Sequence, residues 1–252
     1  MKAEMSERLF TSRMKLADII AENHNIILLL PRFGIPLGFG DKSVREVCSA
    51  NDVPVDFMLL ICNVYTFDDY LPDIESLSTT DMRPLLRYLE ESHSYYTNER
   101  LPHIEVHLHH IADRIGQRYG EILKQFYADF RREITEHFRD EERYDFPKLR
   151  RLQEGERKAE SGERKAESGE RKAESGVRKA ESGKNESHNG LVDKLNDLTQ
   201  IVYKYLPGNV LPEETMEVVF DILQLAADIQ KHALIEDKIL TPYVDWLERR
   251  LK

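Results

Sequence analysis

The sequence has few cysteines and no long apolar run, which argues against a disulfide-rich protein and against a membrane-spanning one. Its two cysteines, Cys48 and Cys62, form neither a CxxC motif nor a disulfide framework. The longest apolar run, residues 26–30, is far shorter than the roughly 18 residues that a membrane-spanning helix requires. The first residues also lack the apolar core of a signal peptide. We therefore expect a cytoplasmic protein.

Basic residues are outnumbered: 36 Lys and Arg stand against 46 Asp and Glu, for a formal net charge of −10. Residues 1–75 contain seven basic and twelve acidic residues, a net charge of −5. Two short helices expected at 41–50 and 54–65 have the spacing of a helix-turn-helix, but a DNA-reading helix needs basic neighbours to hold phosphates. We expect neither a nucleic acid nor an anionic membrane as a partner.

The periodicity of the apolar residues is helical throughout, which predicts an all-α protein. Residues 1–75 form a small N-terminal helical domain, in which Pro31 ends the first helix, and residues 68–78 read as a polar linker. Glycines and prolines then divide residues 76–252 into four longer helices in an up-down-up-down four-helix bundle. The four helices are expected at about 80–115, 121–151, 186–206 and 213–252, with turns at 116–120 and 207–212.

An internal repeat interrupts the second domain at 152–185. Four seven-residue units follow one another, of which the first is Glu156–Gly162. Alanine is the sole apolar residue in the intact unit and each unit ends in glycine, so no coiled-coil seam can form. The repeat predicts a solvated linker; the sequence assigns it no function.

One spaced pattern occurs twice, at residues 137–147 and 232–242: His, three residues, Glu, five residues, Pro. On a helix, positions i and i+4 share a face, so each copy directs one imidazole and one carboxylate to the same place. Such helices build di-metal sites within bundles. A single copy would more simply be a solvated helix face, but two copies in one register favour metal ligands. The predicted ligands from these copies are His137, Glu141, His232 and Glu236.

Two further histidines fall at the same level of the predicted bundle. At about 1.5 Å per residue, one histidine on each helix lies roughly 25–35 Å from the neighbouring turn. Two metal ions with two bridging carboxylates and two imidazoles each would match this set. Iron or manganese suits these donors better than structural zinc does. The predicted set is His93, His137, Glu141, His188, His232 and Glu236.

The remaining histidines lie elsewhere. His103 and His107 are an i, i+4 pair that could trap a surface metal, but a solvated polar face is the interpretation we favour. Glu142 and Asp237 follow the predicted ligands directly and point about 100° away, which suits a supporting or surface role. Tyr96 and three other aromatic residues are expected to line the core around the site: Tyr95, Phe138 and Tyr144.

These motifs resemble the hemerythrin-like domain of the RIC (repair of iron centres) proteins. The resemblance rests on His137-x3-Glu141 with Phe146-Pro147, on His232-x3-Glu236 with Pro242, and on a histidine opening the third helix. The N-terminal residues are similar to the small leading domain of that family through 16–20, 33–35 and 43–48. The resemblance implies two non-haem iron ions, oxo- and carboxylate-bridged, held by the six residues named above.

The chain departs from that family at three places. Pro36–Gly40 stands where the family has adjacent cysteines, so thiol chemistry of such a pair is not expected here. Aligned on Leu101-Pro102, the family's first histidine falls on Ser94 or on His93, and only an inward-facing His93 can be a ligand. Tyr119 stands near a further histidine that the family often has.

The resemblance implies repair of iron–sulfur centres, or a response to nitrosative or oxidative stress, with damaged iron–sulfur proteins as partners. The alternative is a hemerythrin-like carrier or sensor that binds oxygen or nitric oxide without turnover, and a third is a metal-free scaffold. Whether the chain is an enzyme, what the repair target is, and whether a homodimer forms are open at this point.

Overall fold

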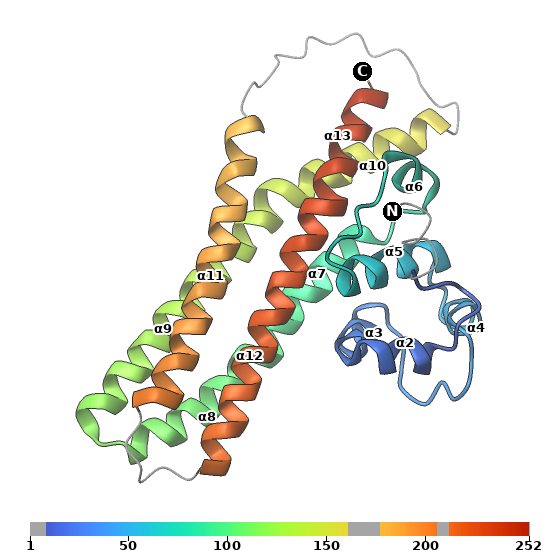
Figure 1. Ribbon diagram of the computed structural model, residues 1–252. Coiled ribbons are helices and arrows are strands. Elements are labelled where there is room, and N and C mark those ends of the chain that lie inside the picture. The colour runs from blue at the N-terminus through green and yellow to red at the C-terminus, as the bar shows by residue number, and fades with distance from the viewer. Residues whose placement is uncertain (1–8, 161–176, 206–211, 252) are drawn as a thin grey trace. The chain divides into compact units, whose positions relative to one another are not determined.

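The computed structural model describes residues 9–160, 177–205 and 212–251; within these, the side chains of Ile74, 157–160, 177–189, Tyr205 and Pro212 are not described. This part of the chain is helical and contains no strand, in agreement with the predicted all-α class (Figure 1). None of the helices described is both long enough and apolar enough to cross a membrane.

The chain forms two compact units, and the boundaries between them fall inside helical runs. The first unit comprises the described parts of Met1–Glu91, Leu149–Glu163 and Leu234–Lys252. The second comprises those of Ser92–Lys148 and Arg164–Ala233. The predicted domains, 1–75 and 76–252, stay a prediction.

Short helices make up most of the first unit. Ser43 starts one of them with a capping box, because its hydroxyl accepts from the Glu46 N–H and the Glu46 carboxylate accepts from the Ser43 N–H. The prediction of a polar linker at 68–78 was wrong in part, since Asp73 caps a further short helix. The elements are α2 (Leu16–Glu22), η1 (His24–Leu28), α3 (Leu29–Arg32), α4 (Val44–Ala50), α5 (Val55–Thr66), α6 (Ile74–Thr79), α7 (Leu85–Tyr95), α10 (Phe146–Glu160), η4 (Glu236–Leu240) and α13 (Thr241–Arg250).

Long helices make up the second unit and share one hydrophobic core. Leucine, isoleucine, valine and aromatic side chains from α8, α9, α11 and α12 meet in it, among them Ile104, Phe130, Leu195 and Ile229. The elements are η2 (Tyr96–Arg100), α8 (Leu101–Arg114), α9 (Gln117–Asp140), η3 (Glu141–Asp145), α11 (Val177–Tyr205) and α12 (Pro212–Ile235).

Helices α8 and α9 form a tight hairpin (Figure 1). Gly116 makes the turn with φ of 88°, a left-handed conformation that glycine adopts without strain. The sequence placed Gly120 in this turn as well, but Gly120 lies inside α9. A Cβ there would come within 2.3 Å of the Ala112 carbonyl oxygen, so glycine is needed for the close approach of the two helices.

The repeat is helical at both described edges. Helix α10 continues to Glu160, inside the first unit of the repeat, and α11 begins at Val177, in the last. The interpretation of 152–185 as a solvated linker stays a prediction. Residues 161–176 lie outside the described part of the chain.

In the described part of the chain three helical runs contain a five-residue π turn, and one residue separates the end of each turn from a proline. In each, the residue preceding the proline donates its N–H to the carbonyl five positions earlier: Leu101 to Tyr96, Phe146 to Glu141 and Thr241 to Glu236. Proline lacks an N–H, and its ring clashes with the carbonyl four positions earlier in an α-helix. A wider turn relieves this clash, and π turns are frequent at functional sites.

Candidate metal centre

Four buried side chains meet in one cluster, which we call the buried centre: His93, Glu141, His232 and Glu236. Each offers one ligand atom, and these atoms all lie within 4.8 Å of one another. None of the four residues is more than 5% exposed. Metal sites require several donors converging on one point, and these donors converge from helical runs that are far apart in the sequence.

Helix geometry explains how these residues reach one place. His232 lies in the last turn of α12, and Glu236, four residues later, is on the same face at the start of the π turn η4. Glu141 begins the π turn η3 in the same way. Each glutamate stands six residues before a proline, so the repeated spacing seen in the sequence marks where the helix widens.

The distances between donor atoms match those around a shared ion. His93 Nε2 lies 3.2 Å from His232 Nε2 and 3.4 Å from Glu141 Oε2. Two ligands bound to one ion at about 2.0–2.2 Å, and at roughly 90–110° to each other, are about 3.0–3.4 Å apart. One ion could therefore bind both imidazoles and Glu141.

Glu141 directs its two oxygens to different histidines. Oε2 faces His93, whereas Oε1 lies 3.3 Å from Nε2 of His137, which is one helical turn earlier in α9. Each oxygen of this carboxylate therefore has an imidazole nitrogen beside it.

A contact with Glu142 orients the imidazole ring of His93. Its Nδ1 lies 3.0 Å from Oε1 of Glu142, whose side chain is 45% exposed. A proton on Nδ1 shared with Glu142 leaves the Nε2 lone pair facing the cluster. Glu142 thus has the supporting role that its place after Glu141 suggested.

Charge at the cluster favours a cation. Burial lowers the pKa of His93, but the carboxylates of Glu141 and Glu142 outweigh burial and raise the pKa overall. The raised pKa reports concentrated negative charge around a buried imidazole. The same charge attracts a metal ion, which replaces protons when it binds.

Aromatic rings cover the imidazoles. His93 is stacked on Phe138 at 4.2 Å and on Phe146 at 5.3 Å, and Tyr96 lies 5.8 Å from His232. The sequence anticipated Phe138 and Tyr96 but missed the contact with Phe146, which was visible only as part of the Phe-Pro motif. Tyr144 was predicted here wrongly, since its side chain is 65% exposed.

The structure brings together four of the six predicted ligands and places His137 beside one of them. His93 faces inward at 1% exposure, as a ligand at this position requires. His188 lies in α11, but its side chain is outside the described residues. His103 and His107 lie apart from the buried centre, as expected.

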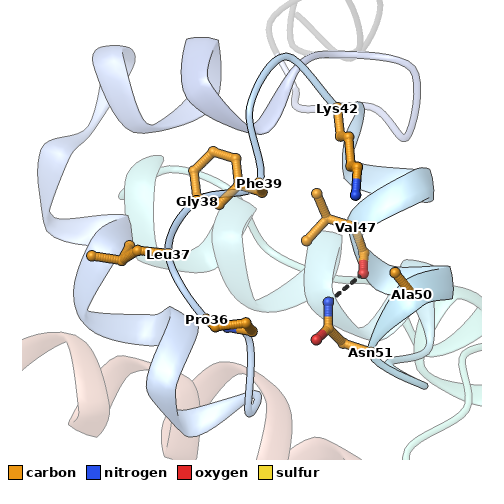
Figure 2. A pocket seen from close by; sticks show the side chains of 8 residues that line it. All are labelled: Pro36, Leu37, Gly38, Phe39, Lys42, Val47, Ala50 and Asn51. Carbon is orange, nitrogen blue, oxygen red and sulfur yellow. Dashed lines mark hydrogen bonds between the residues drawn. The ribbon is translucent and has the colours of Figure 1, made fainter.

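A surface pocket of about 210 Å³ in the first unit has a different character (Figure 2). It lies between the loop at residues 36–40 and α4, where Asn51 donates to the Val47 carbonyl at 2.8 Å. Among its lining residues only Lys42 is charged. The pocket offers no carboxylate, imidazole or thiol, so it lacks the donors of a metal site.

The donor set fits a metal ion of intermediate hardness. Imidazole nitrogen and carboxylate oxygen without thiolate suit iron and manganese, and burial of two carboxylates would be costly without a compensating cation.

No protein-family model matches the chain, and no curated protein matches it.

Proposed function

We propose that this protein is a non-haem di-iron protein of the RIC type, with a hemerythrin-like up-down-up-down four-helix bundle. In this proposal α7–α8, α9–α10, α11 and α12–α13 supply the four helices. Its function is repair of iron–sulfur centres, or a response to nitrosative or oxidative stress, in the cytoplasm.

The main support for this proposal is the position of Glu141. Its oxygens face His93 on one side and His137 on the other, at 3.4 and 3.3 Å. His93, His232 and Glu236 would hold one ion with Glu141. His137 would hold the second ion, and His188 is the ligand proposed to accompany it. Both glutamates would balance the charge of the pair.

The chain's own residues define what can happen at this site. Phe138 and Phe146 flank His93 and exclude bulk water, which strengthens electrostatic interactions inside. Glu142 connects the buried His93 Nδ1 to the surface and can hold the proton of that nitrogen. Bound iron would supply one-electron redox chemistry and affinity for diatomic molecules such as oxygen and nitric oxide.

Burial favours a second candidate function, a carrier or sensor of diatomic gases without turnover. The ligand residues of the buried centre are at most 5% exposed, so a protein substrate cannot touch the donor atoms in this conformation. A diatomic molecule needs far less room. Repair would then require that iron or an electron leave the site.

The test is elemental analysis of freshly purified protein together with its absorption spectrum. We expect about two irons per chain with near-ultraviolet charge-transfer bands. Absence of metal after anaerobic loading with ferrous iron would contradict the proposal, and tight binding of manganese or zinc alone would contradict its iron identity. Reversible spectral change with gas favours the carrier, and restored activity of a damaged iron–sulfur enzyme favours repair.

A further inference from the structure

An exposed row of apolar side chains runs along α12 in the second unit. Phe220 is 69% exposed, Met216 is 52% exposed and Leu223 is 44% exposed, and Ala227 is exposed as well. These positions follow one another at intervals of four, three and four residues, so they share one face of the helix. We call these four residues the apolar stripe.

The opposite face of α12 is apolar too. Val218, Ile222, Leu225 and Ile229 are buried in the hydrophobic core of the second unit. A surface helix ordinarily directs one apolar face at the core and a polar face at water. A helix that is apolar on both faces is ordinarily covered on both, so we expect the apolar stripe to contact a further surface.

The apolar stripe is large enough to be an interaction surface. The exposed fractions of Met216, Phe220 and Leu223 correspond to on the order of 300 Å² of apolar surface. Contiguous apolar patches of about 300–600 Å² are often functional. Two such stripes packed together, with the polar residues beside them, come near the lower end of specific protein interfaces, about 1,000 Å² in total. A reversible association is therefore expected.

The order of residues along the apolar stripe makes it complementary to itself. The midpoint between Phe220 and Leu223 is also the midpoint between Met216 and Ala227. An antiparallel two-fold pairing about this point places Phe220 of one copy against Leu223 of the other, and Met216 against Ala227. A larger side chain then meets a smaller one at each step, which allows the two helices to interdigitate.

Charge at the two ends of the apolar stripe fits the same pairing. Glu213 lies three residues before Met216, and Lys231 lies four residues after Ala227 on the same side of the helix. In the antiparallel pairing the Glu213 carboxylate of each copy lies near the Lys231 ammonium of the other, whereas a parallel pairing would bring like charges together. We propose that the apolar stripe is a two-fold interface, at which α12 packs antiparallel on α12 of a second copy of this chain.

Sedimentation equilibrium of the full chain over a range of concentrations tests the proposal. We expect the mass to rise reversibly with concentration from 29.5 kDa to twice that value. Phe220→Lys should weaken the association at least tenfold, because it places a charge at the centre of the interface. Ile122→Lys is the matched control, since Ile122 is 59% exposed on α9 and its variant should associate like the parent. A chain that stays monomeric at every concentration, or equal association by the parent and Phe220→Lys, would overturn the proposal.

Exchange of the end charges tests the antiparallel direction and leaves the apolar stripe intact. Glu213→Lys alone and Lys231→Glu alone each bring like charges together at both ends, so each variant should associate more weakly than the parent. An equimolar mixture of the two variants restores opposite charges at both ends and should associate at least threefold more strongly than either variant alone. Restoration on mixing excludes unfolded chains as the cause of the weakening. A mixture that associates no more strongly than its components would contradict the antiparallel pairing.

Discussion

The buried centre and the ion pair of His103 with Asp221 on the surface use similar side chains in very different surroundings. Both pair an imidazole nitrogen with a carboxylate oxygen at 3.1–3.4 Å, and both draw on the same helical run, at His93 and at His103. His93 is 1% exposed, whereas the His103 side chain is 49% exposed.

That difference in exposure changes what each cluster requires. Two carboxylates removed from water carry a large desolvation cost, which protons or a metal ion must offset. The pair of His103 and Asp221 stays hydrated, and Arg100 already balances the charge of Asp221, so the pair is stable without an ion. A bound cation would therefore stabilise the buried centre, whereas the pair of His103 and Asp221 needs none.

The largest expected effect comes from removing a ligand of the buried centre. Glu141→Ala and His232→Ala should each lose most of the bound iron, because the remaining donors cannot complete the set. His109→Ala serves as the control and should keep the iron content of the parent. Elemental analysis after desalting gives the result, and equal loss from all three variants would contradict the assignment of the site.

A smaller effect is expected from the packing that supports the helices. Gly120→Ala places a methyl group 2.3 Å from the Ala112 carbonyl oxygen, and backbone cannot move aside as a flexible side chain can. We expect the free energy of unfolding to fall by about 2–3 kcal/mol. Gly190 has nothing within 4 Å of its added Cβ and lies in α11, so Gly190→Ala should raise that free energy by about 0.5–1 kcal/mol.

Denaturant unfolding of the two glycine variants measures this difference. Equal stability of Gly120→Ala and the parent would show that α8 and α9 separate at little cost. The buried centre would then depend on its ligands and metal more than on the packing of this hairpin.

Local patterns in the sequence anticipated the helices and much of the buried centre. The i, i+4 pairing of His232 with Glu236 and of His137 with Glu141 follows from helix geometry alone. The spacing to proline was visible too, but its consequence, a π turn that begins at each glutamate, depends on how a helix accommodates the proline ring.

Contacts between distant segments could not be predicted from the sequence. Nothing in the residues near His103 indicates Asp221, more than a hundred positions later, and Phe146 gave no sign of stacking on His93. The sequence suggested a turn at Gly120, because close helix approach and left-handed turns both favour glycine. Such features depend on tertiary packing, which a single sequence does not specify locally.

A substitution of Glu142, at the edge of the buried centre, is expected to have a more moderate effect on metal affinity. Partners that orient a ligating histidine typically affect metal affinity by about 10–100-fold, and the 45% exposure of Glu142 points to the lower end. We expect Glu142→Ala to weaken iron binding about tenfold without abolishing it. Glu136→Ala, an exposed glutamate on α9, is the matched control. Competition with a coloured chelator measures the affinity, and identical values for both variants would remove Glu142 from the supporting role.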